Sequence, residues 1–311
     1  MAHERGRCSG QSLLQRLSPI QADVTVKLTQ RLVAVDLKEL FREAAAKFAE
    51  GGLVLDIREK ELVIVGDLHG DRDTLDIILE KWGNKKLLFL GDYVDRGRHG
   101  LEVLKTVVGL YLEGRAYVLR GNHESPLMNE DGGFIDELCL LKRLPNCAEL
   151  YGEIEKMFAR MPLAAKINDV LLAVHGGVPL KEPSMEPAAL EELKAVRGDL
   201  TLPEDPLAFQ ALWNDPCDCE SYMPSPRGPG IWLYGRRPTA EFLKREGLKG
   251  IVRGHLYVEQ GFVRHNSVVY TIFSSKAGPY RAVRPKIGIY SGDILAIKDV
   301  YTDDTLAEIK I

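Results

Sequence analysis

The sequence predicts a mixed α/β fold in which two β-sheets pack face to face and helices cover the outside. Strand and helix patterns alternate through the first half of the chain, and short apolar runs there end in glycine. Hairpin-like patterns with a period near two fill the C-terminal part. Strands that alternate with helices indicate parallel strands joined by right-handed crossovers. A chain of 311 residues is long enough to bury the core of such a fold.

The first half supplies strands and helices in turn. A helix is predicted over residues 36–51, because Asp36 can cap its start and glycine marks its end. Two more helices are predicted over 73–83 and 99–114. Apolar runs that end in glycine predict three buried strands, which are ELVIVGD (61–67), KLLFLGD (86–92) and AYVLRGN (116–122).

The second half continues with helices and then with hairpins. Helices are predicted over 132–144, 149–161 and 239–247, and strands over 170–177 and 250–255. The Pro-, Gly- and Ser-rich stretch 214–230 reads as a long loop within the domain, and such loops are often functional. The hairpins are predicted over 261–275 and 286–304. We expect residues 1–50 to form an N-terminal helical extension and 51–311 a single catalytic domain.

The composition excludes several classes of protein. A net charge of −4 argues against a nucleic-acid binder that depends on bulk positive charge. The chain has no run of eighteen apolar residues that could cross a membrane, and its first twenty residues lack the apolar core of a signal peptide. The five cysteines show no spacing typical of a disulfide framework or a zinc site. We therefore expect a cytoplasmic protein with no membrane or nucleic-acid partner.

Polar side chains follow five of the predicted strands, at the point where each strand ends. The ligands that suit a metal or a phosphate come directly after the apolar runs, and they are Asp67, His69, Asp92, Asp95, Arg96, Asn122, His123, His175 and His255. In open α/β sheets, ligands bind outside the carboxyl ends of the strands. Any one of these patterns could be an ordinary turn or helix cap, but five in order along the chain predict a common site.

The residue types indicate a pair of divalent metal ions. Aspartate, histidine and an amide oxygen, without cysteine, suit Mn, Fe or Zn better than Ca or Mg alone. Two metals about 3.5–4 Å apart need a shared ligand, and one carboxylate can supply an oxygen to each. Such a pair lowers the pKa of a bridging water and presents hydroxide to phosphorus. The pattern therefore predicts phosphoester hydrolysis with two metal ions, of which Mn²⁺ is our first choice.

The successive motifs resemble those of the PPP family of serine/threonine protein phosphatases, within the metallophosphoesterase superfamily. The matching segments are GDLHG, GDYVDRG, GNHE, HGG and RGH, and they span about residues 50–300. The resemblance implies a calcineurin-like β-sandwich of two mixed sheets flanked by helices. It also implies hydrolysis of phosphoserine and phosphothreonine in phosphorylated proteins by direct attack of a metal-bridging hydroxide. We expect a prokaryotic or archaeal type of member.

The resemblance also implies a role for each motif residue. Asp67 and His69 would hold the first metal, and Asp92 would bridge to the second. Asn122, His175 and His255 would complete the second metal site, with Asn122 also near the substrate. Arg96 would bind phosphate oxygens, a task for which a planar guanidinium is suited. His123 would be the general acid, oriented by Asp95.

Three further residues belong to segments that depart from the family pattern. LWNDP resembles a family Trp-Ser-Asp-Pro segment, so Asp215 lies either near the site or in an ordinary Asp-Pro turn. SPRGPG makes Arg227 the candidate for a second phosphate-binding arginine. Near the C-terminus, TIFSSKAGPYRAVRP replaces the family Ser-Ala-Pro-Asn-Tyr segment, and Tyr280 is the candidate for its substrate-binding tyrosine.

Two other functions are compatible with parts of this pattern. A dinucleoside polyphosphate hydrolase or phosphodiesterase of the same superfamily would share the metal motifs, but it would usually vary the segment that holds Asp95 and Arg96. A catalytically inactive scaffold would be expected to lose at least one of the ligands, and none is lost here. The sequence favours the protein phosphatase, and it gives no indication of regulatory subunits.

Overall fold

The computed structural model describes residues 36–311. Most of the predicted N-terminal extension, residues 1–35, lies outside the described residues. The rest of it forms α2 (Leu37–Gly51), which begins where the Asp36 side chain accepts a hydrogen bond from the backbone N–H of Lys38. This helix buries Phe41 and Phe48 in one core with the neighbouring helices.

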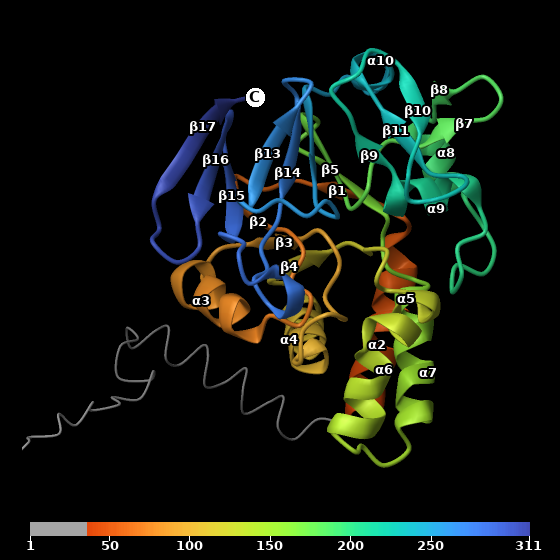
Figure 1. The fold of residues 1–311 in the computed structure, drawn as a ribbon, viewed down its shortest axis with the longest axis vertical. Helices are drawn as coiled ribbons and strands as arrows, with labels where there is room; N and C mark the ends of the chain where they lie inside the picture. Colours follow the sequence, from red (N-terminus) through yellow and green to blue (C-terminus); the bar gives the residue numbers. More distant parts are fainter. Residues whose placement is uncertain (1–35) are drawn as a thin grey trace, which may run out of the picture.

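Two six-stranded mixed sheets form the centre of the molecule (Figure 1). One sheet has the order β1-β5-β6-β12-β14-β13, and the other has the order β17-β16-β15-β2-β3-β4. The first comprises β1 (Val54–Ile57), β5 (Ala164–Ile167), β6 (Leu171–Val174), β12 (Gly250–Arg253), β13 (Phe262–His265) and β14 (Val269–Ile272). The second comprises β2 (Glu61–Val65), β3 (Leu87–Phe89), β4 (Ala116–Val118), β15 (Lys286–Ser291), β16 (Ile294–Asp299) and β17 (Thr305–Lys310).

Three clusters of buried apolar side chains lie between the layers of sheets and helices. One lies between the sheets and takes side chains such as Ile64 and Leu88 from one sheet and Ala173 and Val252 from the other. A second cluster lies between the outer face of the β2-β3-β4 sheet and the helices that cover it. A third lies between the outer face of the other sheet and its helices. The helices around the second cluster are α2, α3 (Arg72–Trp82), α4 (Gly100–Leu112) and α7 (Cys147–Phe158). Those around the third are α8 (Leu190–Ala195), α9 (Pro206–Trp213) and α10 (Arg236–Glu246).

The predicted strand directions are confirmed. β2, β3 and β4 pair in parallel, as the alternation of strands and helices predicts. β6 and β12 are also parallel neighbours, but they belong to the other sheet. Both C-terminal hairpins are present, since β13 pairs antiparallel with β14 and β15 with β16. The two sheets thus point the carboxyl ends of five strands toward one edge of the sandwich.

Some elements differ from the prediction. The helix expected over 132–144 is broken, because Gly133 adopts a φ of 101° between α5 (Pro126–Gly132) and α6 (Phe134–Asp136). A π-helical turn, η2 (Glu137–Leu141), follows. The loop predicted over 214–230 contains the short strands β9 (Asp215–Pro216) and β10 (Tyr222–Pro224), which pair with β11 (Trp232–Tyr234).

The expectation that the cysteines form no disulfide framework is wrong. Disulfides join Cys139 to Cys147 and Cys217 to Cys219. The turn between η2 and α7 brings the first pair of Cα atoms to 5.4 Å, and the chain reversal after β9 brings the second pair to 5.2 Å. Both separations lie within the usual range for a disulfide. The fold brings Cys139 and Cys147 together, whereas Cys217 and Cys219 are close because they are only two residues apart. None of the described helices is long and apolar enough to cross a membrane.

Candidate metal and phosphate site

The first group of predicted ligands lies where β2 and β3 end. Asp67, His69 and Asp92 are all buried. His69 Nε2 lies 3.4 Å from Asp92 Oδ2 and 3.9 Å from Asp67 Oδ2. The other nitrogen of His69 donates a hydrogen bond to the carbonyl oxygen of Val94 at 3.0 Å. Nε2 therefore carries a free lone pair that faces two carboxylate oxygens, as a metal ligand would.

The second group lies on the opposite side of the Asp92 carboxylate. Asp92 Oδ1 lies 3.3 Å from His175 Nε2. Asn122 Oδ1 lies 2.9 Å from the same nitrogen and 2.7 Å from His255 Nδ1. His175 Nδ1 donates to the carbonyl oxygen of Leu90 at 2.9 Å, which leaves its Nε2 free for a ligand role. The two oxygens of one carboxylate thus face two separate groups of ligands.

The electrostatics of the site favour bound cations. Burial raises the pKa of Asp67 to about 7, and burial with the nearby Asp67 charge raises that of Asp92 well above its usual value. Burial also lowers the pKa of His69, His175 and His255 well below 6.5, so these rings stay neutral. Buried carboxylates without a counter-charge are costly, and neutral imidazoles are the form that binds metal.

The donor set fits two divalent metal ions. Asp67 Oδ2 and His255 Nε2 are buried and have no hydrogen-bond partner among the described residues. Ligand atoms of His69, Asp92 and His123 lie within 4.8 Å of one another, and so do those of Asp92, His175 and His255. Both groups share Asp92, which is the arrangement that a bridging carboxylate requires.

His123 is held by Asp95 beside the shared carboxylate. His123 Nδ1 lies 2.7 Å from Asp95 Oδ2, and the His123 backbone N–H donates to Asp92 Oδ1 at 2.9 Å. Burial raises the pKa of Asp95 to about 7, and burial with the charges of Arg96 and Arg227 lowers the pKa of His123 to about 3. Burial therefore disfavours the charged form of each group.

Asn129 also holds this pair, and sequence reasoning missed it. Its side-chain amide donates to Asp95 Oδ2 at 2.9 Å and to the carbonyl oxygen of His123 at 2.7 Å. The Tyr151 hydroxyl donates in turn to Asn129 Oδ1 at 3.0 Å. Asn129 is fully buried on α5, and no motif marked it in the sequence. It fixes the orientation of both members of the pair.

Glu124 anchors the same loops from below. Its carboxylate accepts backbone N–H groups of Asp92, Tyr93 and Gly121 at 2.7–2.9 Å. It is fully buried and ties the loop after β3 to the loop after β4.

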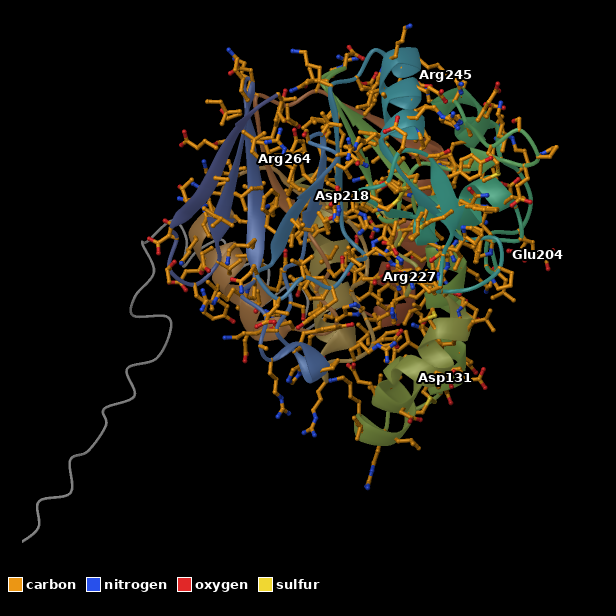
Figure 2. All side chains as sticks on the ribbon, turned by 45° about the horizontal axis from the view of Figure 1, so that its top comes forward. Asp131, Glu204, Asp218, Arg227, Arg245 and Arg264 are labelled. Carbon is orange, nitrogen blue, oxygen red and sulfur yellow. A yellow bond between two sulfur atoms is a disulfide. The ribbon has the colours of Figure 1, made fainter. Side chains whose placement is uncertain are left out.

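Arg227 reaches the site through Asp215. Arg227, labelled in Figure 2, comes from the loop after β10, and its Nε donates to Asp215 Oδ2 at 2.6 Å. Asp215 Oδ1 accepts from Arg253 Nη2 at 2.9 Å, and Asp215 Oδ2 lies 4.0 Å from His255 Nε2. Asp215 is therefore near the site and is not an ordinary turn residue. Sequence reasoning missed Arg253, which is fully buried in the strand before His255.

Tyr280 lies against the first group of ligands. Its ring stacks on the His69 ring with 5.2 Å between centroids, and it packs edge-on against Phe273 at 4.9 Å. Burial and the charges of Asp67 and Asp92 raise the pKa of the Tyr280 hydroxyl to about 12. The uncharged Tyr280 side chain thus borders the first group of ligands.

The backbone of the site is unusual. Positive φ angles of 45–67° occur at five predicted site residues that are not glycine, namely His69, Asp92, Asp95, Arg96 and His255. This conformation costs of order 1–3 kcal/mol for such a residue, and it tends to cluster where function requires it. At this site it turns side chains from successive strand ends toward one another.

Comparisons with known proteins agree on one family. The calcineurin-like phosphoesterase profile matches residues 61–259. The chain is 32% identical over 241 residues to a probable serine/threonine-protein phosphatase of Encephalitozoon cuniculi. This alignment covers 73% of the present chain and 51% of the relative. It is 30% identical over 271 residues to serine/threonine-protein phosphatase PP1-1 of Saccharomyces cerevisiae. That alignment covers 83% of the present chain and 82% of the relative.

A solved structure gives the same result. A serine/threonine phosphatase from Saccharomyces cerevisiae, described as similar to human phosphatase PP5, superposes with a TM-score of 0.74 at 25% identity. The superposition covers 83% of this chain and 82% of that one. The chain spans about half the length of the Encephalitozoon relative and 37% of the length of another curated relative.

Proposed function

Because the chain belongs to the serine/threonine protein phosphatases of the calcineurin-like phosphoesterase family, we propose that it hydrolyses phosphoserine and phosphothreonine in proteins. The family and the calcineurin-like fold predicted from the sequence are confirmed. The expected prokaryotic or archaeal type has no support, since the curated relatives reported above come from eukaryotes. The observation that carries the proposal is the Asp92 carboxylate between two ligand groups, with His123 beside it.

The metal ligands are proposed as a shared set. Asp67 and His69 would hold one ion, Asn122, His175 and His255 would hold the other, and Asp92 would contact both. We propose Mn²⁺ at both positions, and Fe or Zn suits the same ligands. When bound, such ions polarise a phosphoryl oxygen and lower the pKa of a water molecule, which supplies the nucleophile.

The side chains around the metals would bind the phosphate. Arg96 and Arg227 would neutralise its charge, and the hydrogen bond of 2.6 Å from Arg227 to Asp215 supports this role for Arg227. Asn122 and Tyr280 would line the substrate position, with the Tyr280 ring excluding water from one side. A guanidinium held by a carboxylate loses less freedom when substrate binds, so Asp215 would act as a positioning residue.

His123 would protonate the leaving oxygen of the serine or threonine. Burial, and after it the charges of Arg96 and Arg227, lower the pKa of His123 in the free protein. A bound phosphate dianion would offset both charges, so it would raise the pKa of His123 when the acid is needed. Asp95 and Asn129 would hold the ring so that Nε2 faces the leaving group. An alkoxide leaves poorly without a proton, which is why the reaction needs this acid.

Metal removal is expected to destabilise the fold. A cation present at 100 times its Kd contributes about 2.7 kcal/mol, which corresponds to about 5–10 °C in Tm for a domain of this size. Dialysis against EDTA should lower Tm by that amount, and added Mn²⁺ should restore both Tm and phosphatase activity. Metal content measured before and after dialysis is the control. An unchanged Tm after complete loss of metal, or turnover without metal, would contradict the two-metal site.

The substrate class is tested by a direct comparison. We expect kcat/KM on a phosphoserine peptide to exceed that on diadenosine tetraphosphate by at least about tenfold, or about 1.4 kcal/mol of transition-state stabilisation. Both assays use the same Mn²⁺-loaded preparation. The reverse order would favour a dinucleoside polyphosphate hydrolase or phosphodiesterase. Absence of turnover on both substrates, in protein that contains two metals, would favour an inactive scaffold.

The remaining proposals concern the chain as a whole. We propose that residues 51–311 form one catalytic domain. The helix before it, α2, packs its apolar side chains into the core of that domain. Phosphorylated proteins are the proposed partners. A cytoplasmic location remains a prediction, and the two disulfides remove the argument from cysteine spacing that favoured it.

A further inference from the structure

A basic groove adjoins the phosphate site, and the proposed catalytic roles do not use it. It is a hollow of about 540 Å³ between the loops at 70–73, 96–99 and 276–281. Arg96, which is proposed to bind the phosphate, lines this hollow, and so does Gly70, the residue that follows the proposed metal ligand His69. The groove therefore adjoins the position proposed for the scissile phosphate.

Positive charge dominates the groove. Its cationic side chains are Arg72, Arg96, Arg98, Lys276 and Arg281, and its carboxylates are Asp71 and Asp73. Asp71 is buried, and its oxygens accept hydrogen bonds from Thr74 and from the backbone N–H of Lys276. Asp73 is thus the only exposed carboxylate among these lining residues. A chain of net charge −4 therefore carries a local excess of positive charge beside its proposed active site.

Two of the arginines are free to bind a ligand. Arg98 and Arg281 are exposed, and neither side chain has a hydrogen bond or ion pair within residues 36–311. Arg72 differs, because it binds Asp76 and Thr106. Lys276 also differs, because its ammonium lies 3.6 Å from the centroid of the Tyr301 ring. Arg98 and Arg281 thus supply donors that no described side chain uses.

The loops that carry these arginines are held close together. A Cβ atom on Gly97 would lie 2.2 Å from the carbonyl oxygen of His69. A Cβ atom on Gly278 would lie 2.2 Å from the carbonyl oxygen of Arg96, and Gly278 has a φ of 54°. Only glycine permits these backbone contacts. The loops that line the groove therefore pack directly against each other and against the loop that holds His69.

We propose that this groove binds an anionic side chain of the substrate that flanks the phosphorylated residue. The inference rests on the proposed phosphatase function and narrows its substrates to acidic phosphopeptides. Arg98 and Arg281 would each pair with a carboxylate or a second phosphate, to both of which a planar guanidinium donates two hydrogen bonds. The shared chemistry is a compact anion a few residues from the scissile phosphate.

The test compares kcat/KM on phosphoserine peptides of one sequence. One peptide has neutral flanks, one has glutamates on both sides, one has further phosphoserines on both sides, and one has lysines. We expect the wild-type protein to prefer the acidic peptides about threefold to tenfold over the neutral one, mainly through KM, because exposed ion pairs contribute modestly. Added salt should reduce this preference. The glutamate and phosphoserine arms show which anion the groove favours.

Substitutions separate the groove from the catalytic site. In Arg98→Gln/Arg281→Gln the preference should disappear, while the rate on the neutral peptide stays unchanged. In Arg98→Glu/Arg281→Glu the lysine-flanked peptide should become the better substrate. The matched control is Arg236→Gln, since Arg236 is an exposed arginine at the start of α10, an element far from α3 and α4 (Figure 1). This control should keep the wild-type preference.

The outcomes distinguish this inference from the function on which it rests. Equal kcat/KM on neutral and acidic peptides would overturn the proposed role of the groove and leave the proposed phosphatase function intact. A preference that survives in Arg98→Gln/Arg281→Gln would also overturn it. Absence of turnover on all four peptides would overturn the proposed function, and the groove with it.

Discussion

Replacing Asp92 with asparagine is expected to lower kcat on a phosphopeptide by at least about 10³-fold, because several kcal/mol of metal-dependent stabilisation is lost. The two oxygens of this carboxylate face separate ligand groups at 3.3 and 3.4 Å. An amide presents one weak oxygen ligand and one NH₂ group, so it cannot serve both metals. Bound metal, measured by mass spectrometry, should fall below two ions per chain.

Asp56→Asn is the matched control for this substitution. Asp56 is an exposed carboxylate on β1 that pairs with Arg58 at 3.0 Å, and its loss should leave kcat and metal content unchanged. The Asp92 variant keeps an oxygen that can accept the backbone N–H of His123, so its fold should persist. An Asp92→Asn protein with two metals and near-normal kcat would contradict the role of Asp92 as a bridge.

Replacing His123 with asparagine is expected to lower kcat on a phosphoserine peptide by about 10²–10⁴-fold, the usual contribution of a positioned acid. The loss on an activated aryl phosphate should be far smaller, because a phenolate with electron-withdrawing groups leaves without a proton. Asp95 Oδ2 lies 2.7 Å from His123 Nδ1 and would lose this partner. Steady-state kinetics on the two substrates at one metal concentration measure the difference.

His99→Asn provides the control for the histidine substitution. His99 is exposed at the start of α4 and makes no side-chain capping hydrogen bond there. Its replacement should leave kcat on a neutral-flanked phosphopeptide unchanged. Equal losses on the phosphopeptide and the aryl phosphate in His123→Asn would reject the general-acid role and would indicate a role in binding.

The sequence predicts most of the site because each ligand directly follows a buried strand. Asp67 and Asp92 come two and three residues after β2 and β3, so a local apolar run is enough to place them at a strand end. The prediction could not assign strands to sheets. β6 and β12, which are followed by His175 and His255, lie in the sheet opposite β2, and that division depends on long-range pairing.

The residues that sequence reasoning missed act through contacts distant in the chain. Asn129 is a single polar residue on a short helix, and its importance appears only once Asp95 lies 2.9 Å away. Arg253 sits in an apolar strand, and its partner Asp215 is 38 residues earlier. β17 was missed because it is an edge strand with mostly exposed side chains, so its apolar periodicity is weak. Local patterns carry no information about such partners.

The division of the ligands between two sheets has a consequence for how the protein matures. The proposed ligands span residues 67–255, and those of the second group come from both halves of the chain. During synthesis the first sheet edge can form only part of the site until β12 has emerged and docked. The proposed metal site can therefore be complete only after β12 has docked, so we expect a chain that ends before β12 to lack phosphatase activity.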